Sequence, residues 1–174
     1  SFTLKELAEQ AGVTSSVVKG LVKQNAVLEQ DTPRDTAFPR LDPDGQTRDL
    51  TEDQATAAHH LRETACAGTY ATTLLRGVTG SGKTEVYLEA VAETLRQNRQ
   101  ALILLPEIAL TAEFITRMEV RFGARPAEWH SGVTMTERRR IWKMTAQGAC
   151  QVVVGARSAL FLPFQDLGLI VVDE

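Results

Sequence analysis

The chain has 174 residues, of which 43% are hydrophobic and 24% charged, and its formal net charge is −3. This length predicts one domain, or one domain with a small appendage, and is enough to bury a hydrophobic core. The composition excludes collagen-like, disulfide-stapled and charge-driven disordered proteins. No apolar run approaches the roughly 20 residues of a membrane helix, and no signal peptide is evident, so we expect a cytoplasmic protein without membrane contact.

Residues 1–28 predict a small helical module. Apolar residues recur at helical spacing on both sides of a break at Gly12, and Val27-Leu28 resembles a short strand. Helix, glycine turn, helix and strand are the outline of a helix-turn-helix or winged-helix module. Its three Lys and two Glu give a net charge of only +1. Packing or weak contact with a DNA backbone is therefore as good an interpretation as sequence reading.

Residues 31–49 contain three prolines and have the composition of a linker. We therefore expect two parts: a partial winged-helix module with its linker over residues 1–45, and an α/β lobe over residues 46–174. The chain begins on a helix cap and ends directly after an apolar strand. This pattern predicts a piece of a longer protein.

After the linker, predicted helices and strands alternate. The strands are continuous apolar runs, typical of strands buried on both faces, which favours a doubly wound, mostly parallel sheet. Cys66 and Cys150 are isolated and are expected to be buried, reduced thiols. The expected order is helix 52–65, strand 70–75, helix 83–97, strand 101–105, helix 111–122, a short strand ending at Trp129, helix 136–147, and strands 151–154 and 169–172.

Residues 77–84 match the phosphate-binding loop G-x-x-x-x-G-K-[ST], between a predicted strand and a predicted helix. The glycines let backbone N–H groups surround phosphate oxygens, and the helix start adds its positive dipole. We expect Lys83 to contact the β- and γ-phosphates and the Thr84 hydroxyl to bind Mg²⁺. The expected nucleotide-binding residues of the loop are Gly77, Thr79, Gly80, Ser81, Gly82, Lys83 and Thr84.

Asp173 and Glu174 follow the last apolar strand and supply the acidic half of such a site. We expect Asp173 to hold Mg²⁺ and Glu174 to polarise the attacking water, which makes Lys83 and Glu174 the candidate catalytic residues. The adjacent glutamate favours hydrolysis over phosphoryl transfer to a small molecule. Upstream, Gln54 either completes a capping box with Thr51 or recognises adenine, and the sequence leaves both interpretations open.

Two more segments, 106–111 and 155–159, follow buried strands, and the carboxyl ends of parallel strands line the ligand edge. Each is either an ordinary turn or a contact for a nucleic-acid backbone. A basic run at Arg138–Arg140 and Lys143 is either a solvated helix face or a DNA patch. His130 has no evident acidic partner and is not expected to be catalytic. The candidate DNA-binding residues are Pro106, Thr111, Arg157 and Ser158.

Together these motifs carry a family resemblance. They read G-V-T-G-S-G-K-T-E-V-Y-L at 77–88, P-E-I-A-L-T at 106–111, R-F-G at 121–123, H-S-G at 130–132, E-R at 137–138 with Trp142, G-A-R-S-A-L-F-L-P-F at 155–164 and L-G-L-I-V-V-D-E at 167–174. In this order they closely resemble the bacterial PriA family of replication-restart helicases, in helicase superfamily 2. The resemblance covers residues 50–174, and the preceding part resembles the family's winged-helix domain more distantly.

The resemblance implies a RecA-like P-loop NTPase lobe that uses ATP and Mg²⁺. It implies 3′ to 5′ unwinding of DNA during fork restart and primosome assembly, at the nucleoid. Expected partners are forked or single-stranded DNA, single-stranded DNA-binding protein and other primosome proteins. In this comparison Gln54 resembles the adenine-reading glutamine, and Asp173-Glu174 begin the D-E-x-H motif.

Several parts of that family are missing from these residues: the second RecA-like lobe, its arginine finger and the zinc-binding cysteines. We therefore expect the piece alone to bind nucleotide weakly and not to unwind DNA. Two other hypotheses remain at this stage. One is a transcription regulator that joins a helix-turn-helix reader to a P-loop switch, and the other is a small-molecule kinase.

Overall fold

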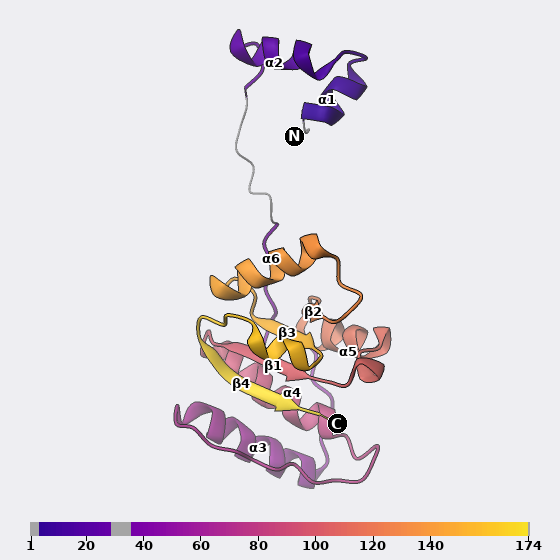
Figure 1. Ribbon diagram of the computed structural model, residues 1–174. Helices are drawn as coiled ribbons and strands as arrows, with labels where there is room; N and C mark the ends of the chain where they lie inside the picture. Colours follow the sequence, from indigo (N-terminus) through magenta and orange to yellow (C-terminus); the bar gives the residue numbers. More distant parts are fainter. Residues whose placement is uncertain (1–3, 29–35, 174) are drawn as a thin grey trace. The chain divides into compact units, whose positions relative to one another are not determined.

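The computed structural model describes residues 4–28 and 36–173 (Figure 1). The chain divides into two compact units, and the second unit begins at Ala37. This division precedes the one expected at residue 45, because residues 37–45 pack on the second unit. There Leu41 is buried, and its N–H donates to Gln151 Oε1 over 2.8 Å. The later part of the expected linker is thus part of the α/β unit.

The described part of the first unit is a helical pair, α1 (Leu4–Gln10) and α2 (Ser15–Lys23), as predicted. Gly12 lies in the connecting turn with a left-handed φ of +64°. The strand expected at Val27-Leu28 is wrong, because both residues are irregular and Leu28 is 87% exposed. An isolated two-residue segment gains little from an extended conformation unless another strand pairs with it.

The second unit alternates helices and strands. Threonines begin three of its helices, because the side-chain oxygens of Thr51, Thr111 and Thr134 accept hydrogen bonds from backbone N–H groups three residues on. In chain order the elements are α3 (Glu52–Cys66), α4 (Lys83–Arg96), β1 (Gln100–Leu104), η1 (Glu107–Ala109), α5 (Ala112–Phe122), β2 (Ala127–Trp129), α6 (Met135–Ala146), β3 (Val152–Gly155), η2 (Arg157–Phe161) and β4 (Leu167–Val172).

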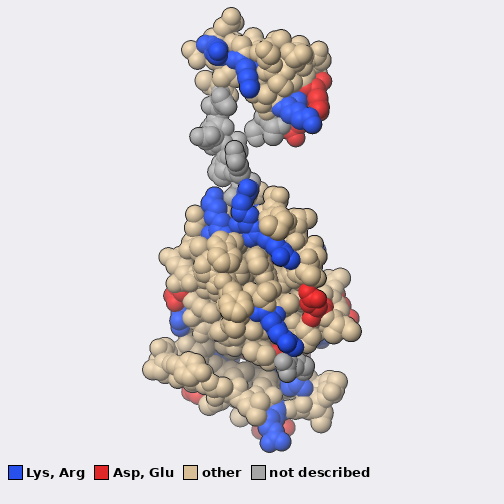
Figure 2. All heavy atoms as spheres, viewed as in Figure 1, with Lys and Arg blue, Asp and Glu red and all other residues tan. Residues whose placement is uncertain are grey.

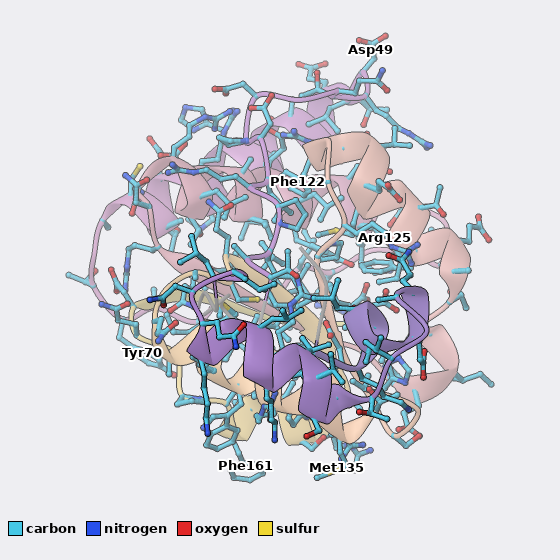
Figure 3. All side chains as sticks on the ribbon, turned by 90° about the horizontal axis from the view of Figure 1, so that it is seen from above. Asp49, Tyr70, Phe122, Arg125, Met135 and Phe161 are labelled. Atoms are coloured by element: carbon cyan, nitrogen blue, oxygen red, sulfur yellow. The ribbon has the colours of Figure 1, made fainter. Side chains whose placement is uncertain are left out.

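The four strands form a parallel sheet in the order β2-β3-β1-β4. On one face, Val91 of α4 and Phe122 of α5 are fully buried against the sheet, and on the other face Ile141 of α6 is equally buried. Figure 1 shows α3 and α4 on one side of the sheet and α6 on the other. In Figure 3, Phe122 lies inside the molecule, whereas Phe161 lies at its periphery. The predicted doubly wound, RecA-like arrangement is confirmed.

The strand expected at residues 70–75 is wrong. This segment is irregular, and Tyr70 and Leu74 are 96% and 81% exposed. Within residues 36–173, β4 pairs only with β1, so that one edge of β4 is open and Ile170 and Val172 are exposed. The composition of residues 70–75 suits a strand. Local propensity, however, does not determine whether a segment finds a pairing partner.

The two cysteines differ in exposure. Cys150 is buried as predicted, but Cys66 is exposed at the end of α3. Its thiol donates to Glu93 Oε1 on α4 over 3.1 Å, which gives the sulfur a polar partner at the surface. None of the described helices has the length and apolar character needed to cross a membrane.

Candidate functional site

The predicted phosphate loop is a turn that runs directly into α4. Gly80 and Gly82 have left-handed φ angles of +79° and +78°, which residues with side chains rarely adopt. A Cβ at Gly77 would lie 2.5 Å from the Ser81 Oγ, so a side chain there would force Ser81 to shift. Since α4 begins at Lys83, the free backbone N–H groups and the positive dipole of its first turn lie beside the loop.

The Lys83 ammonium group lies against the loop itself. Its Nζ donates to the carbonyl oxygens of Gly77 and Val78 over 2.9 and 3.1 Å. Thr79 is exposed in the turn, and Thr84 is partly buried in the first turn of α4. The structure therefore gathers all the predicted loop residues at the N-terminus of one helix.

Gln54 joins α3 to this loop. Both bonds of the capping box are present: Gln54 Oε1 accepts from Thr51 N–H, and Thr51 Oγ1 accepts from Gln54 N–H. The amide Nε2 also donates to the Ser81 carbonyl over 2.8 Å, a contact that the sequence does not reveal. Of the two interpretations left open, the capping role is confirmed, and adenine recognition stays a prediction.

Asp173 directly follows β4, and its backbone N–H donates to the Leu104 carbonyl over 3.0 Å. Its carboxylate Oδ2 accepts a hydrogen bond of 2.9 Å from the Tyr87 hydroxyl on α4. Burial, followed by the charge of Asp173, raises the pKa of Tyr87 well above its ordinary value. Glu174 lies outside the described residues.

The predicted DNA-binding residues share the edge where Asp173 lies. All four strands are parallel, so their carboxyl ends meet at one edge of the sheet. Pro106 and Thr111 flank η1 after β1, while Arg157 and Ser158 begin η2 after β3. All four residues are exposed. The Thr111 hydroxyl also caps α5 by accepting a hydrogen bond from Phe114 N–H. This edge therefore carries both the acidic residue and the two candidate nucleic-acid segments.

Side chains that sequence reasoning missed connect these segments. Glu107 Oε1 accepts from Ser131 N–H over 3.1 Å, which links the residues after β1 to those after β2. Trp129 Nε1 donates to Ser158 Oγ over 3.1 Å, which links β2 to η2. The signal for these contacts is the Trp-His-Ser-Gly sequence at the end of β2, whose H-S-G part contributes to the family resemblance but does not by itself reveal the pairing partners.

The basic run on α6 is partly structural. The Arg138 guanidinium donates to the carbonyls of His130, Ser131 and Val133 and lies 5.6 Å from the centre of a Trp129 ring. Arg140 lies 4.0 Å over the Phe38 ring. Figure 2 shows Lys and Arg side chains gathered over α6. The Arg138 guanidinium therefore closes the loop after β2, a role that neither interpretation included, and DNA contact by the basic run stays a prediction.

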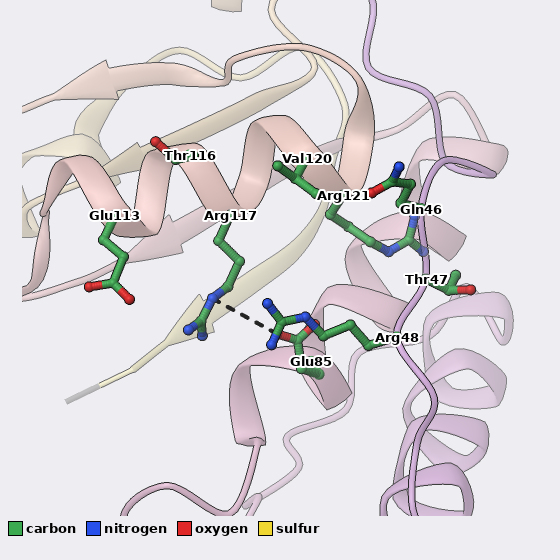
Figure 4. Close-up of a pocket in the computed structure, with 9 residues that line it drawn as sticks. All are labelled: Gln46, Thr47, Arg48, Glu85, Glu113, Thr116, Arg117, Val120 and Arg121. Atoms are coloured by element: carbon green, nitrogen blue, oxygen red, sulfur yellow. Dashed lines mark ion pairs between the residues drawn. The ribbon is translucent and has the colours of Figure 1, made fainter.

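A groove of about 570 Å³ lies between α5, the start of α4 and residues 46–48 (Figure 4). In it, Arg48 Nη1 and Arg117 Nε approach Glu85 Oε1 at 3.7 and 3.9 Å. Glu85 follows Thr84 directly, so this carboxylate connects the loop helix to α5. The cluster was not predicted, because its members are far apart in the chain.

Comparison with known proteins places this geometry in a family. Residues 51–174 match the family model described as DEAD/DEAH box helicase. The chain is 36% identical to the "Replication restart protein PriA" of Bacillus subtilis, over 97% of this chain and 21% of that protein. The protein of the same name from Rickettsia felis is 46% identical, over 72% of this chain and 19% of that protein. The one from Chlamydia pneumoniae is 35% identical, over 98% of this chain and 23% of that protein.

The chain thus spans about a fifth of the length of the curated relatives it matches. The matches confirm the resemblance that the ordered motifs predict. Since the family model covers more than half of these residues, the chain belongs to the DEAD/DEAH box helicase family.

Proposed function

We propose that this chain is the first motor lobe of an ATP-dependent DNA helicase acting in replication restart, preceded by part of a winged-helix module. One observation carries the proposal. The glycine loop at the start of α4 and the acidic Asp173 at the end of β4 are joined through Tyr87. The helicase match over residues 51–174 favours this function over a transcription regulator or a small-molecule kinase.

The loop residues fit a nucleotide polyphosphate. A Cβ at Gly82 would lie 2.5 Å from Gln54 Nε2, and one at Gly77 would lie 2.5 Å from Ser81 Oγ, so that a side chain at either position would displace a neighbour in the loop. Backbone N–H groups of residues 77–84 would hold phosphate oxygens, and Lys83 would add its charge at the β- and γ-phosphates. Gln54, already at the loop, would read adenine with its amide.

The oxygen donors near the loop fit Mg²⁺. The Thr84 hydroxyl and the Asp173 carboxylate are hard ligands of the kind this ion prefers, and Tyr87, three residues after Thr84 on α4, hydrogen-bonds Asp173. When bound, Mg²⁺ would neutralise charge that develops on the phosphates. Thr84 and Asp173 would hold the ion, and we propose that Glu174 accepts a proton from the attacking water.

The proposed nucleic-acid face is the edge formed by the residues after β1 and β3. Pro106, Thr111, Arg157 and Ser158 are the proposed contacts to a DNA backbone. Forked or single-stranded DNA, unwound in the 3′ to 5′ direction, is the proposed substrate. Single-stranded DNA-binding protein and other primosome proteins at the nucleoid are the proposed partners. A second lobe would close the nucleotide site, so we expect the isolated piece to hydrolyse ATP poorly.

The test is ATP hydrolysis by the full-length protein that carries these residues, with and without forked DNA. We expect DNA to raise the rate manyfold and Lys83→Ala to abolish it. Arg125→Ala, which removes an exposed cation ahead of β2, should match the wild type. A rate that needs Lys83 but ignores DNA would support the nucleotide site and reject the helicase. Rapid DNA-stimulated turnover by the 174-residue chain alone would contradict its expected incompleteness.

A further inference from the structure

Tyr87 is near both residues proposed to hold Mg²⁺: it follows Thr84 on α4 and hydrogen-bonds Asp173. It lies three residues after Thr84 on α4, so both side chains occupy one face of that helix. Its ring is only 5% exposed and belongs to the core beneath the sheet. Its hydroxyl donates to Asp173 Oδ2 over 2.9 Å.

Asp173 is restrained at two points, because its backbone N–H donates to the Leu104 carbonyl and its side chain accepts from Tyr87. β4 ends at Val172, so Asp173 lies just beyond the last ladder residue, and its side chain is tied down from α4. The tyrosine bonds to one carboxylate oxygen, Oδ2, so the carboxylate keeps further lone pairs for another ligand. The ring is fixed by packing, so that the position of its oxygen is set by the core rather than by solvent.

We propose that Tyr87 is a positioning residue, which orients Asp173 toward Thr84 so that the two side chains present their oxygens to Mg²⁺ together. The inference rests on the proposed function, because it assumes a nucleotide-bound Mg²⁺ at this site. Outer-shell partners of metal ligands commonly contribute about 10- to 100-fold to metal affinity.

The decisive variant is Tyr87→Phe, which removes one oxygen and keeps the buried ring. Its matched control is Tyr70→Phe, which removes the hydroxyl of the other tyrosine, 96% exposed in the segment before the loop. The measurement is equilibrium binding of a fluorescent ADP analogue to the full chain, titrated with Mg²⁺ and repeated in a chelator. This readout requires no turnover.

We expect Tyr87→Phe to raise the Mg²⁺ concentration for half-maximal enhancement of binding by about 10-fold or more, with metal-free affinity unchanged. Tyr70→Phe should behave as the wild type. The double variant Tyr87→Phe/Asp173→Asn should be no worse than Asp173→Asn alone, because the tyrosine acts through that carboxylate.

Three outcomes would overturn the inference. The first is an unchanged or lower Mg²⁺ requirement in Tyr87→Phe. The second is an equal loss of binding with and without the metal, which would mark a purely structural role. The third is full additivity in the double variant. A wild-type chain whose nucleotide binding ignores both Mg²⁺ and Lys83→Ala would instead reject the proposed function itself.

Discussion

Arg121, near the end of α5, is a cation buried in the second unit, with 4% of its side chain exposed. Its Nη2 donates to Glu89 Oε1 on α4 over 2.9 Å, and its Nη1 donates to the Pro43 carbonyl over 3.1 Å. The guanidinium also lies 4.8 Å from the centre of the Phe122 ring. One side chain therefore joins α5 to α4 and to the segment that precedes α3.

Replacing Arg121 with Met keeps much of the aliphatic volume but leaves the Glu89 carboxylate without its hydrogen-bonded cation. Removing one member of a buried pair costs about 3–5 kcal/mol. Arg62 Nη1 remains 3.6 Å from Glu89 Oε2 and offsets part of this loss. We therefore expect the free energy of unfolding to fall by about 3 kcal/mol. For a domain of this size, that lowers Tm by roughly 6–12 °C.

Urea unfolding of the full chain, followed by circular dichroism, measures the effect. The matched control is Arg125→Met, which breaks an exposed pair with Glu128 at 3.2 Å and should cost less than about 1 kcal/mol. Arg121→Met/Glu89→Leu removes both charges and should recover much of the loss. The reasoning is refuted if Arg121→Met is no more harmful than Arg125→Met, or if the double variant is less stable than Arg121→Met alone.

Two other predictions concern single residues. Gly82→Ala should lower the free energy of unfolding in urea by about 2–3 kcal/mol, because φ is +78° and a Cβ would lie too close to Gln54. The control Gly123→Ala, at φ +70° with open space around it, should lower it by only about 1–2 kcal/mol. Equal losses in the two variants would exclude the clash with Gln54. Burial raises the pKa of Cys150 to about 12 from 9.0, while the bond to Glu93 raises the pKa of Cys66 as well. Because Cys66 is exposed and Cys150 is buried, a thiol reagent at pH 8 should label Cys66 alone in the folded chain. The stability contributed by Cys150 is full below pH 9 and is lost as pH rises toward 12. Two fast-reacting thiols at pH 8, or equal alkaline destabilisation of Cys150→Ala and wild type, would contradict this.

Most elements of the second unit could be predicted because their signals are local. Thr51 and Thr111 mark helix starts through bonds that span three residues, and the apolar run at β3 identifies a buried strand. The glycines of the phosphate loop are equally local, since each is required by its own backbone angle or by the nearest side chain. These features need no knowledge of the rest of the chain.

The features that could not be predicted depend on contacts between residues that are far apart in the chain. Nothing in residues 70–75 says whether another strand is available, so propensity alone predicted a strand that is not there. Tyr87 and Asp173 are 86 positions apart, and Arg121 and Glu89 are 32 apart, so no spacing rule brings either pair together. The sequence of the loop was therefore enough to locate the site. The side chains that connect the loop to the sheet could be identified only from the three-dimensional structure.

The open edge of β4 has a consequence for handling the protein. Its sequence, LGLIVV, has neither the charged residues nor the proline that usually protect an exposed strand from pairing with other molecules. A net charge of −3 offers little long-range repulsion between chains. We therefore expect the backbone of this strand edge, rather than the overall composition, to limit the solubility of the chain. Concentrated samples should self-associate through intermolecular sheet formation, and a lysine introduced at the exposed Ile170 should suppress it.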